Sequence, residues 1–303
     1  MKILVTGGAG FIGSNLVDRL VRDQYGHVSV FDDFSRGRLE NLSQTGKAIR
    51  IVYGNILDFE RLRAEMVGTE VVFHFAALSN VLDCVNNPAA AIRTNVEGTR
   101  QVLEAARQTG VRRVVLASSR EVYGEAANLP VLESSPLNPK NIYGASKVAA
   151  EKVCAEYAAC GLELTILRLS NVYGTRDRGR VIPLFIERAL RAEPITIYGK
   201  NKLLDLVWIE NLLDVLTRAV QLPCPTRPMN IGCGKGTRLV ELAARVCALT
   251  DQTSSIHIAE EREPEVEHFV AEVTAARRHF SLHCPDDPLE YLPYVVEDFR
   301  TRM

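Results

Sequence analysis

The chain of 303 residues has 36 basic and 37 acidic side chains, with a formal net charge of -1. Hydrophobic residues make up 47% of it and charged residues 24%, which is typical of globular proteins and unlike disordered, collagenous or coiled-coil chains. The length is about twice that of a usual domain, so we expect one large or two fused domains. The balanced charge argues against a nucleic-acid partner or an anionic membrane, because both select an excess of Lys and Arg.

The sequence has no apolar run of the roughly 20 residues that cross a bilayer, and its apolar start at residues 3–5 leads at once into Thr6 and Gly7. We therefore expect no membrane segment and no signal peptide. The seven cysteines form no Cys-x-x-Cys pair, are odd in number, and none stands in an evident site with a base. We interpret them as reduced thiols of a cytoplasmic protein.

The first two thirds of the chain alternates short β-branched runs with amphipathic stretches, a pattern typical of βαβ units on a parallel sheet. These runs predict six strands, over 2–6, 27–32, 49–53, 71–76, 112–118 and 163–169. Apolar positions three and four residues apart predict helices over 12–22, 88–108 and 141–159. Right-handed crossovers between such strands build an α/β fold with a doubly wound parallel sheet of Rossmann type, which binds ligands at the carboxyl ends of its strands.

The pattern changes after residue 171. A polar, Arg-rich segment precedes a predicted helix over 183–191, a short strand over 195–198 and loops that contain several prolines. We predict a smaller C-terminal domain made of residues 173–204 and 223–303. Residues 1–172 form the sheet domain in this prediction, and residues 205–222 are expected to return to it.

Three evenly spaced glycines follow the first strand, in the run from Thr6 to Gly13. Gly7 permits a sharp turn, Gly10 lets the backbone approach a diphosphate, and Gly13 lets the next helix pack closely on the sheet. The start of that helix offers N–H groups and the positive end of its dipole to phosphates. The sequence therefore predicts a dinucleotide-binding loop.

Asp32 ends the second strand, about twenty residues beyond this loop, where dinucleotide-binding folds place an acidic ribose ligand. Its carboxylate can accept hydrogen bonds from both ribose hydroxyls and repels a 2′-phosphate, which favours NAD over NADP. Arg36 and Arg38 weaken that preference, because a guanidinium can bind the additional phosphate. The plainer interpretation is a tight βα turn followed by a solvated acid.

Tyr143 and Lys147 are four residues apart in a predicted helix, so they lie on one of its faces. An adjacent ammonium favours the phenolate and would lower the pKa of the tyrosine, which makes Tyr143 a candidate general base. Ser119 follows the fifth strand, where its hydroxyl can bind the same substrate oxygen. Alone, the spacing is more typical of a core tyrosine and a surface lysine, but behind a dinucleotide loop it favours catalysis.

These motifs together resemble the extended short-chain dehydrogenase/reductase family, in particular its nucleotide-sugar epimerases and dehydratases. The resemblance covers nearly the whole length of the chain. Its motifs are Thr6 to Gly13, His74-Phe75-Ala76-Ala77, Asn95-Val96-Glu97-Gly98-Thr99, Ser118 to Gly124, Tyr143 to Lys147, Asn171-Val172-Tyr173-Gly174 and Asn230-Ile231-Gly232.

The resemblance implies a bound NAD. The residues expected to bind it are Gly7, Gly10, Phe11, Ile12, Gly13, Asp32, Asp33, Ser35, Asn55, Ile56, Ala76, Ala77, Leu78, Asn95, Tyr143, Lys147 and Ser170. In this set, Asn55 and Ile56 are expected beside adenine, and Ser170 beside the nicotinamide ring. Relatives usually have aspartate in place of Asn55, so the adenine contact here would use the amide oxygen.

The resemblance also implies a nucleotide-sugar substrate, UDP-linked by expectation, and gives the smaller domain the role of binding it. The residues expected at the substrate are Ser119, Arg120, Glu121, Tyr143, Asn171, Arg178 and Arg262. Asn171 and Arg262 match positions that contact the diphosphate in relatives. Relatives commonly have an arginine before the aspartate where this chain has Leu204 and Asp205, which predicts an altered diphosphate site.

The loop of residues 175–180 contains three arginines. It is either a solvated turn or a guanidinium fork that faces a diphosphate or the carboxylate of a uronic acid, with Arg178 as the expected ligand. His74, inside the fourth strand, is expected to be a packed core histidine. No His, Cys or acidic residues have the spacing of metal ligands, so we predict no metal.

The expected catalytic residues are Ser119, Tyr143, Lys147 and Glu121, and the last of these leaves the reaction open. In an epimerase, Tyr143 would take the proton of the sugar C4 hydroxyl while NAD serves as a reversible hydride acceptor and a 4-keto sugar forms. Dehydratases and decarboxylases of the family have a glutamate at the position of Glu121, where it could remove a C5 proton. Glu121 could equally be a solvated loop acid paired with Arg120.

We therefore expect an NAD-dependent nucleotide-sugar 4-epimerase, an isomerase acting on a UDP-hexose or UDP-uronic acid. The alternatives are a nucleotide-sugar dehydratase or decarboxylase that uses Glu121, and a dinucleotide-binding regulator without turnover. The intact catalytic residues argue against the regulator. Relatives commonly pair through two helices, here 88–108 and 141–159, so the resemblance also implies a homodimer.

Overall fold

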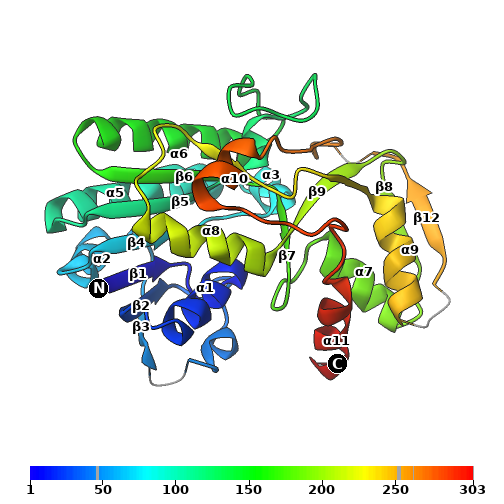
Figure 1. Cartoon of the computed structure of the whole chain (residues 1–303), viewed down its shortest axis with the longest axis horizontal. Helices are drawn as coiled ribbons and strands as arrows, with labels where there is room; N and C mark the ends of the chain where they lie inside the picture. Colours follow the sequence, from blue (N-terminus) through cyan, green and yellow to red (C-terminus); the bar gives the residue numbers. More distant parts are fainter. Residues whose placement is uncertain (46–47, 251–253, 262, 303) are drawn as a thin grey trace. The chain divides into compact units, whose positions relative to one another are not determined.

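Seven strands form the main sheet, in the order β10-β6-β5-β4-β1-β2-β3 (Figure 1). They are β1 (Lys2–Thr6), β2 (His27–Asp32), β3 (Arg50–Tyr53), β4 (Val71–His74), β5 (Arg113–Ser119), β6 (Glu163–Leu169) and β10 (Met229–Ile231). Strand β1 pairs in parallel with both β2 and β4, so the direction of winding reverses between β1 and β4. This reversal is the switch point of a doubly wound sheet, and it confirms the predicted α/β fold of Rossmann type.

The computed structural model describes residues 1–45, 48–250, 254–261 and 263–302. It divides the chain into two units. Unit 1 comprises Met1–Gly124, Pro136–Arg168 and Leu213–Met229, and unit 2 comprises Glu125–Ser135, Leu169–Leu212 and Asn230–Met303. Of the segment 205–222 that we expected in the sheet domain, residues up to Leu212 lie in unit 2 and residues from Leu213 on lie in unit 1.

The helices of unit 1 connect its strands. They are α1 (Phe11–Arg22), α2 (Phe59–Met66), α3 (Val81–Asn86), α4 (Pro88–Ile92), α5 (Gly98–Thr109), α6 (Ile142–Ala159) and, from Leu213 on, α8 (Ile209–Gln221). The helix predicted over 88–108 is present, as α4 and α5 joined by a π-helical turn, η3 (Arg93–Glu97). This turn presents the amide of Asn95 to the backbone of Leu78, accepting from its N–H at 2.8 Å and donating to its C=O at 2.9 Å.

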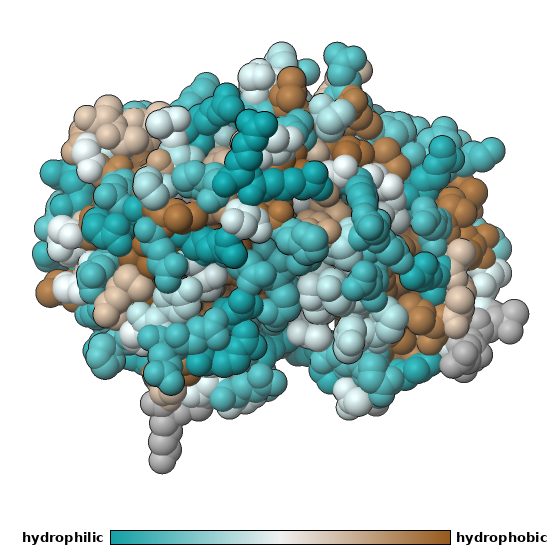
Figure 2. Space-filling view, in the orientation of Figure 1, coloured by the Kyte–Doolittle hydropathy of each residue, from teal (hydrophilic) through white to brown (hydrophobic). Residues whose placement is uncertain are grey.

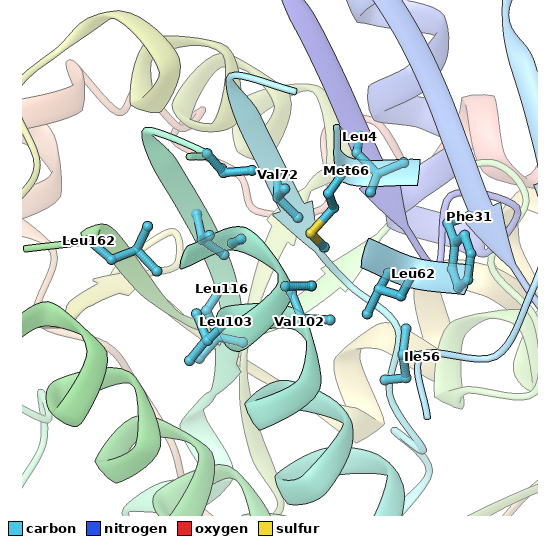
Figure 3. Packing of buried hydrophobic residues seen from close by; sticks show 14 of the residues in the cluster. Leu4, Phe31, Ile56, Leu62, Met66, Val72, Val102, Leu103, Leu116 and Leu162 are labelled. Atoms are coloured by element: carbon cyan, nitrogen blue, oxygen red, sulfur yellow. The ribbon is translucent and has the colours of Figure 1, made fainter. Parts of the chain in front are cut away.

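Figure 3 shows the hydrophobic core of unit 1, where helices α2 and α5 cover one face of the sheet. Leu62 and Met66 of α2 are buried with Val102 of α5 and Leu4 of β1. Because parallel strands are covered on both faces, their sequences are continuous apolar runs. Because of these apolar runs, six of the seven strands were predicted with ends no more than two residues from those observed.

Unit 2 contains two small sheets and its own core. One sheet has the order β11-β9-β7 and the other pairs β12 with β8. The strands are β7 (Asn171–Tyr173), β8 (Ile195–Tyr198), β9 (Leu203–Trp208), β11 (Gly236–Arg238) and β12 (Ile256–Ala259). The helices are α7 (Val181–Leu190), α9 (Leu239–Thr250), α10 (Thr274–Phe280) and α11 (Leu292–Arg302). Side chains from α7, α9 and α11 bury the core of this unit against β8 and β9.

Hydrophilic residues cover most of the face drawn in Figure 2, and apolar residues form small groups among them. Scattered apolar side chains are normal on the surface of a globular protein. Within the described ranges of the chain, no helix is both long enough and apolar enough to span a membrane.

Candidate active site

The glycine-rich loop after β1 has the geometry that a bound diphosphate requires. Gly7 has a φ of +69°, and a Cβ there would lie 2.6 Å from the backbone nitrogen of Ala76. A Cβ on Gly13 would lie 2.3 Å from the carbonyl oxygen of Gly7, so helix α1 packs directly on the turn. Helix α1 begins after Gly10 with no side-chain cap and no acidic residue in its first turn. Its positive end is therefore available for an anion, and the residues fit a dinucleotide.

Asp32, at the end of β2, is buried beside this loop. One carboxylate oxygen accepts the N–H of Ala9 at 2.9 Å, and the other accepts the N–H of Phe34 at 2.8 Å. Burial raises the pKa of Asp32, although both N–H donors oppose the rise. A carboxylate oxygen can accept two hydrogen bonds, so each retains capacity for a ribose hydroxyl. The alternative of a solvated acid is wrong.

Several side chains expected around the adenosine of NAD form hydrogen bonds or ion pairs within the protein. Arg36 forms an ion pair with Asp83 at 2.6 Å, which reduces its availability for the phosphate of NADP. Asp33 accepts both the N–H and the hydroxyl of Ser35, at 2.9 and 2.5 Å. Asn55 donates to the other oxygen of Asp33 at 2.7 Å.

The two residues expected beside adenine differ in exposure. The amide oxygen of Asn55, the expected adenine ligand, already accepts the N–H of Leu57 at 2.9 Å. Ile56 is buried in the core of unit 1, so any contact with adenine is expected from its backbone.

Tyr143 and Lys147 project from α6, and Ser119 ends β5. The ammonium of Lys147 is buried, donates to the carbonyl oxygen of Ala117 at 2.8 Å and lies 5.9 Å from the centroid of the Tyr143 ring. Burial lowers the pKa of Lys147 to about 8. The hydroxyl of Ser119 accepts the N–H of Glu121 at 3.2 Å. The structure thus places the phenol, the ammonium and the hydroxyl on adjoining elements of unit 1.

Asn95 connects the segment after β4 to the catalytic helix. Besides its two bonds to Leu78, its amide nitrogen donates to the hydroxyl of Ser146 at 2.9 Å. That hydroxyl donates in turn to the carbonyl oxygen of Tyr143 at 2.7 Å. The side chain therefore fixes the first turn of α6 to Leu78, whose segment we expect along the nicotinamide.

Glu121 is only 5% exposed, so the prediction of a solvated loop acid is wrong. Its carboxylate accepts a hydrogen bond from the amide of Asn141 at 2.7 Å and forms an ion pair with Arg120 at 2.9 Å. The pairing with Arg120 is therefore confirmed. The sequence analysis did not single out Asn141. Asn directly before a helix is a common N-cap, and the amide oxygen of Asn141 accepts the N–H of Gly144 at 2.8 Å.

A buried charged network below the site was also missed. Arg168 of β6 donates through two nitrogens to the carboxylate of Glu151, and through a third to the hydroxyl of Tyr123 at 2.8 Å. Ser118 donates to the same carboxylate at 2.5 Å. Glu151 follows Lys147 by one helical turn, so the network holds α6 against β5 and β6. The feature of the sequence that indicated this network was Arg168, a charged residue within the apolar run of β6.

His74 is a core histidine, as predicted. Its ring is hydrogen-bonded to the hydroxyls of Thr6 at 2.8 Å and Thr99 at 3.1 Å, and burial lowers its pKa to about 3. In the part of the chain that the structure describes, no three His, Cys, Asp or Glu side chains gather as metal ligands do.

Ser170, Asn171 and Arg178 belong to unit 2. Among the described residues, the hydroxyl oxygen of Ser170 and the amide oxygen of Asn171 are buried without a hydrogen-bond partner, which suits residues that meet a ligand. Arg178 is exposed, and its N–H donates to Asp177 at 3.0 Å. Arg262 lies outside the described residues. Leu204 is buried in the core of unit 2 and cannot replace an arginine as a phosphate ligand.

Asp177 gives the arginine-rich loop a buried acid. It is 2% exposed, lies 3.7 Å from Nε of Arg180, and burial raises its pKa to about 6. The loop of residues 175–180 is therefore anchored at its centre and is not a fully solvated turn.

Comparison with known proteins assigns the chain to a family. The model of the NAD dependent epimerase/dehydratase family matches residues 3–232. The chain belongs to this family. The assignment confirms the predicted resemblance and the prediction of NAD as cofactor.

Similar proteins in this family are named for different activities. The chain is 38% identical over 248 residues to the putative UDP-glucose 4-epimerase of Methanocaldococcus jannaschii, covering 79% of each protein. It is 31% identical over 313 residues to UDP-glucuronic acid decarboxylase 5 of Arabidopsis thaliana, covering 100% of this chain and 90% of that protein. Among solved structures, UDP-glucose 4-epimerase of Thermotoga maritima with UDP-glucose superposes with a TM-score of 0.94 at 31% identity, covering 100% and 99%. The family is therefore certain, while epimerases and decarboxylases both resemble the chain.

Proposed function

We propose that the protein is an NAD-dependent epimerase that inverts C4 of a UDP-hexose or UDP-uronic acid through a transient 4-keto sugar. The observation that supports it most is the Lys147 ammonium, buried 5.9 Å from the centroid of the Tyr143 ring and bonded to Ala117. A cation held at this place favours the phenolate of Tyr143. A binding protein without turnover has no need of such a group.

The roles of the residues follow from their chemistry. The Tyr143 phenolate takes the proton of the C4 hydroxyl and returns it at the end of turnover, while Ser119 donates a hydrogen bond to the same oxygen. NAD, when bound, supplies reversible oxidation at C4. The loop of Gly7 to Gly13 and Asp32 hold the cofactor, and Lys147 binds its nicotinamide ribose. Asn171 and Arg178, both in unit 2, are proposed ligands of the sugar nucleotide diphosphate.

Two observations favour a second candidate, a nucleotide-sugar dehydratase or decarboxylase. Glu121 is buried two residues after Ser119, and a decarboxylase is among the relatives that match the whole chain. Against the lyase stand the two contacts of its carboxylate, with Asn141 and Arg120. They give Glu121 a positioning role that an epimerase also needs.

Incubation with UDP-glucose, UDP-galactose, UDP-glucuronic acid and their N-acetyl counterparts separates the two reactions. An epimerase returns a product of unchanged mass with inverted C4, which mass spectrometry and NMR detect. Loss of water or of carbon dioxide would establish the lyase. Glu121→Gln keeps an oxygen for Asn141 and removes the base, so the epimerase should retain more than about a tenth of its activity whereas the lyase should lose about 100-fold or more.

Tyr143→Phe tests the base directly. Turnover should fall by about 1,000-fold or more, because the variant has no group to take the hydroxyl proton. NAD affinity measured by calorimetry should change little. Tyr157→Phe is the matched control, since Tyr157 is on the same helix but its hydroxyl binds Glu104 at 3.1 Å. Full activity in Tyr143→Phe would contradict the assignment.

We further propose a homodimer through the helical segments 88–108 and 141–159, as expected from the resemblance. Light scattering of the full chain should give the mass of two copies, and a one-chain mass at micromolar concentration would contradict it. The cytoplasmic location stays a prediction from the sequence. We also propose that unit 1 binds NAD and that unit 2 binds the nucleotide sugar.

A further inference from the structure

Two segments of unit 2 that are distant in the sequence lie side by side, and each contains a cysteine. The thiol of Cys284 donates to the carbonyl oxygen of Gly232 at 3.6 Å, and the thiol of Cys233 donates to the carbonyl oxygen of Pro285 at 3.8 Å. Each sulfur thus reaches the residue next to the other cysteine. Lys235 ties the same segments together, because its ammonium lies 2.9 Å from the carbonyl oxygen and 2.8 Å from the carboxylate of Asp286.

The two sulfurs have unequal acidity. The neighbouring Cys284 thiol lowers the pKa of Cys233, burial and the charge of Asp205 oppose this, and the charges of Lys235 and Arg277 support it, so that the pKa is lowered on balance. The neighbouring Cys233 sulfur and burial raise the pKa of Cys284. Arg277 also contacts this turn directly, donating to the carbonyl oxygen of Cys233 at 3.3 Å. The pKa of Cys233 is thus shifted down and that of Cys284 up, which is the order expected of an attacking and a resolving thiol.

The turn of Cys233 is held rigidly. The carboxylate of Asp205 accepts the N–H of Cys233 at 2.6 Å and those of Gly234 and Ala271 at 3.0 Å each. Asp205 is fully buried, so a movement of the turn would cost its carboxylate the hydrogen bonds of these N–H groups. A rigid turn keeps the two sulfurs close and lowers the entropic cost of joining them.

We propose that Cys233 and Cys284 form a reversible disulfide when the protein meets a peroxide. The Cys233 thiolate attacks one oxygen of hydrogen peroxide, the O–O bond breaks, and a sulfenic acid forms with release of hydroxide. The sulfur of Cys284 then attacks that sulfenic sulfur and loses its proton, and water leaves. The two thiols lose two electrons, and the peroxide is reduced to two waters. The proposal does not depend on the reaction proposed above.

The test is oxidation of the folded, full-length protein with a small excess of hydrogen peroxide, followed by blocking of free thiols and tryptic digestion. We expect a cross-linked pair of peptides, lighter by two hydrogens than their sum and separated by dithiothreitol. One peptide also contains Cys224, so fragmentation must place the bond on Cys233. Oxidation should raise the midpoint of thermal unfolding by at least about 2 °C, because the bond closes a long loop.

Three single variants sharpen the result. Cys233→Ser and Cys284→Ser should each abolish the cross-link and the thermal shift, whereas Cys160→Ser, at an exposed cysteine of unit 1, should change neither. A bond that forms only in urea-unfolded protein would overturn the proposal. So would oxidation of Cys233 to the sulfinic acid while Cys284 remains a free thiol.

Discussion

Lys147 shows how one buried charge can serve catalysis and limit it. Its ammonium is desolvated, and burial lowers its pKa to about 8. It is cationic below that pH and neutral above it. Since the charge is what favours the Tyr143 phenolate, catalysis needs a pH at which Lys147 is still protonated.

We therefore expect kcat to fall as the pH rises through about 8. The measurement is kcat between pH 6 and pH 10 with the substrate that the panel identifies. Lys147→Met lacks the charge at every pH, so its residual rate should be at least about 100-fold lower and should not show this decline. A wild-type kcat that is constant up to pH 10 would contradict the role of the ammonium.

Asp177 illustrates a residue whose state sequence reasoning could not predict. Between two arginines it was expected in a solvated turn or a fork, yet it is buried and its pKa is raised to about 6. The spacing of Tyr143 and Lys147, by contrast, is fixed by helix geometry alone and was predictable. The burial of a side chain depends on tertiary packing, which no local pattern in the sequence records.

The raised pKa of Asp177 predicts a pH dependence of stability. The folded state binds the proton more tightly than the unfolded state, so this contribution is fully present below pH 4 and is lost as the pH rises through about 6. Asp177→Asn removes it. Between pH 4 and pH 7 the free energy of unfolding of the wild type should fall by up to about 3 kcal/mol relative to the variant. Urea unfolding of both proteins across this range provides the measurement, and parallel curves would contradict the prediction.

At the scale of elements, the start of α6 is joined to the loop after β5. Asn141 caps the helix through its amide oxygen and holds Glu121 through its amide nitrogen. Gly144 lies against this loop, since a Cβ there would be 2.3 Å from the carbonyl oxygen of Glu121. The position of Tyr143 relative to Ser119 therefore depends on Asn141.

Asn141→Ala should lower stability by about 1 kcal/mol through loss of the cap and lower kcat by at least about 10-fold, because a displaced base acts less efficiently. The matched control is Asp58→Ala, which removes the N-cap of α2. It should cost similar stability and leave kcat unchanged. Equal kcat values in the two variants would show that the cap of α6 has no positioning role.

Strands and helices differed in how far the sequence specified them. Long apolar runs located six strands, but β10 has only three residues, Met229–Ile231, and a run so short has no period of its own. The helix over 88–108 has a regular apolar pattern that hides the π-helical turn at Arg93–Glu97. That turn is set by the bonds of Asn95 to Leu78, which lies seventeen residues earlier. Both strand β10 and the π-helical turn therefore depend on tertiary contacts.

For the whole molecule, the two units have separate hydrophobic cores, and the residues expected to bind NAD are divided unequally between them. All expected NAD ligands except Ser170 belong to unit 1. A ligand that binds only the folded state stabilises it by about 2.7 kcal/mol at 100 times its Kd. That stabilisation should appear first in the unit that supplies the contacts, because units with their own cores can open separately.

Hydrogen exchange with and without NAD tests this expectation. With NAD, amides in β1 and β5 of unit 1 should exchange up to about 100-fold more slowly, whereas amides in α9 and α11 of unit 2 should change by less than about threefold. Asp32→Ala should weaken NAD binding and remove the difference at the same NAD concentration, while Arg36→Ala should not, since Arg36 is already paired with Asp83. Equal slowing in both units would mean that they unfold as one cooperative body, and that burial within each core does not set the size of the unfolding unit.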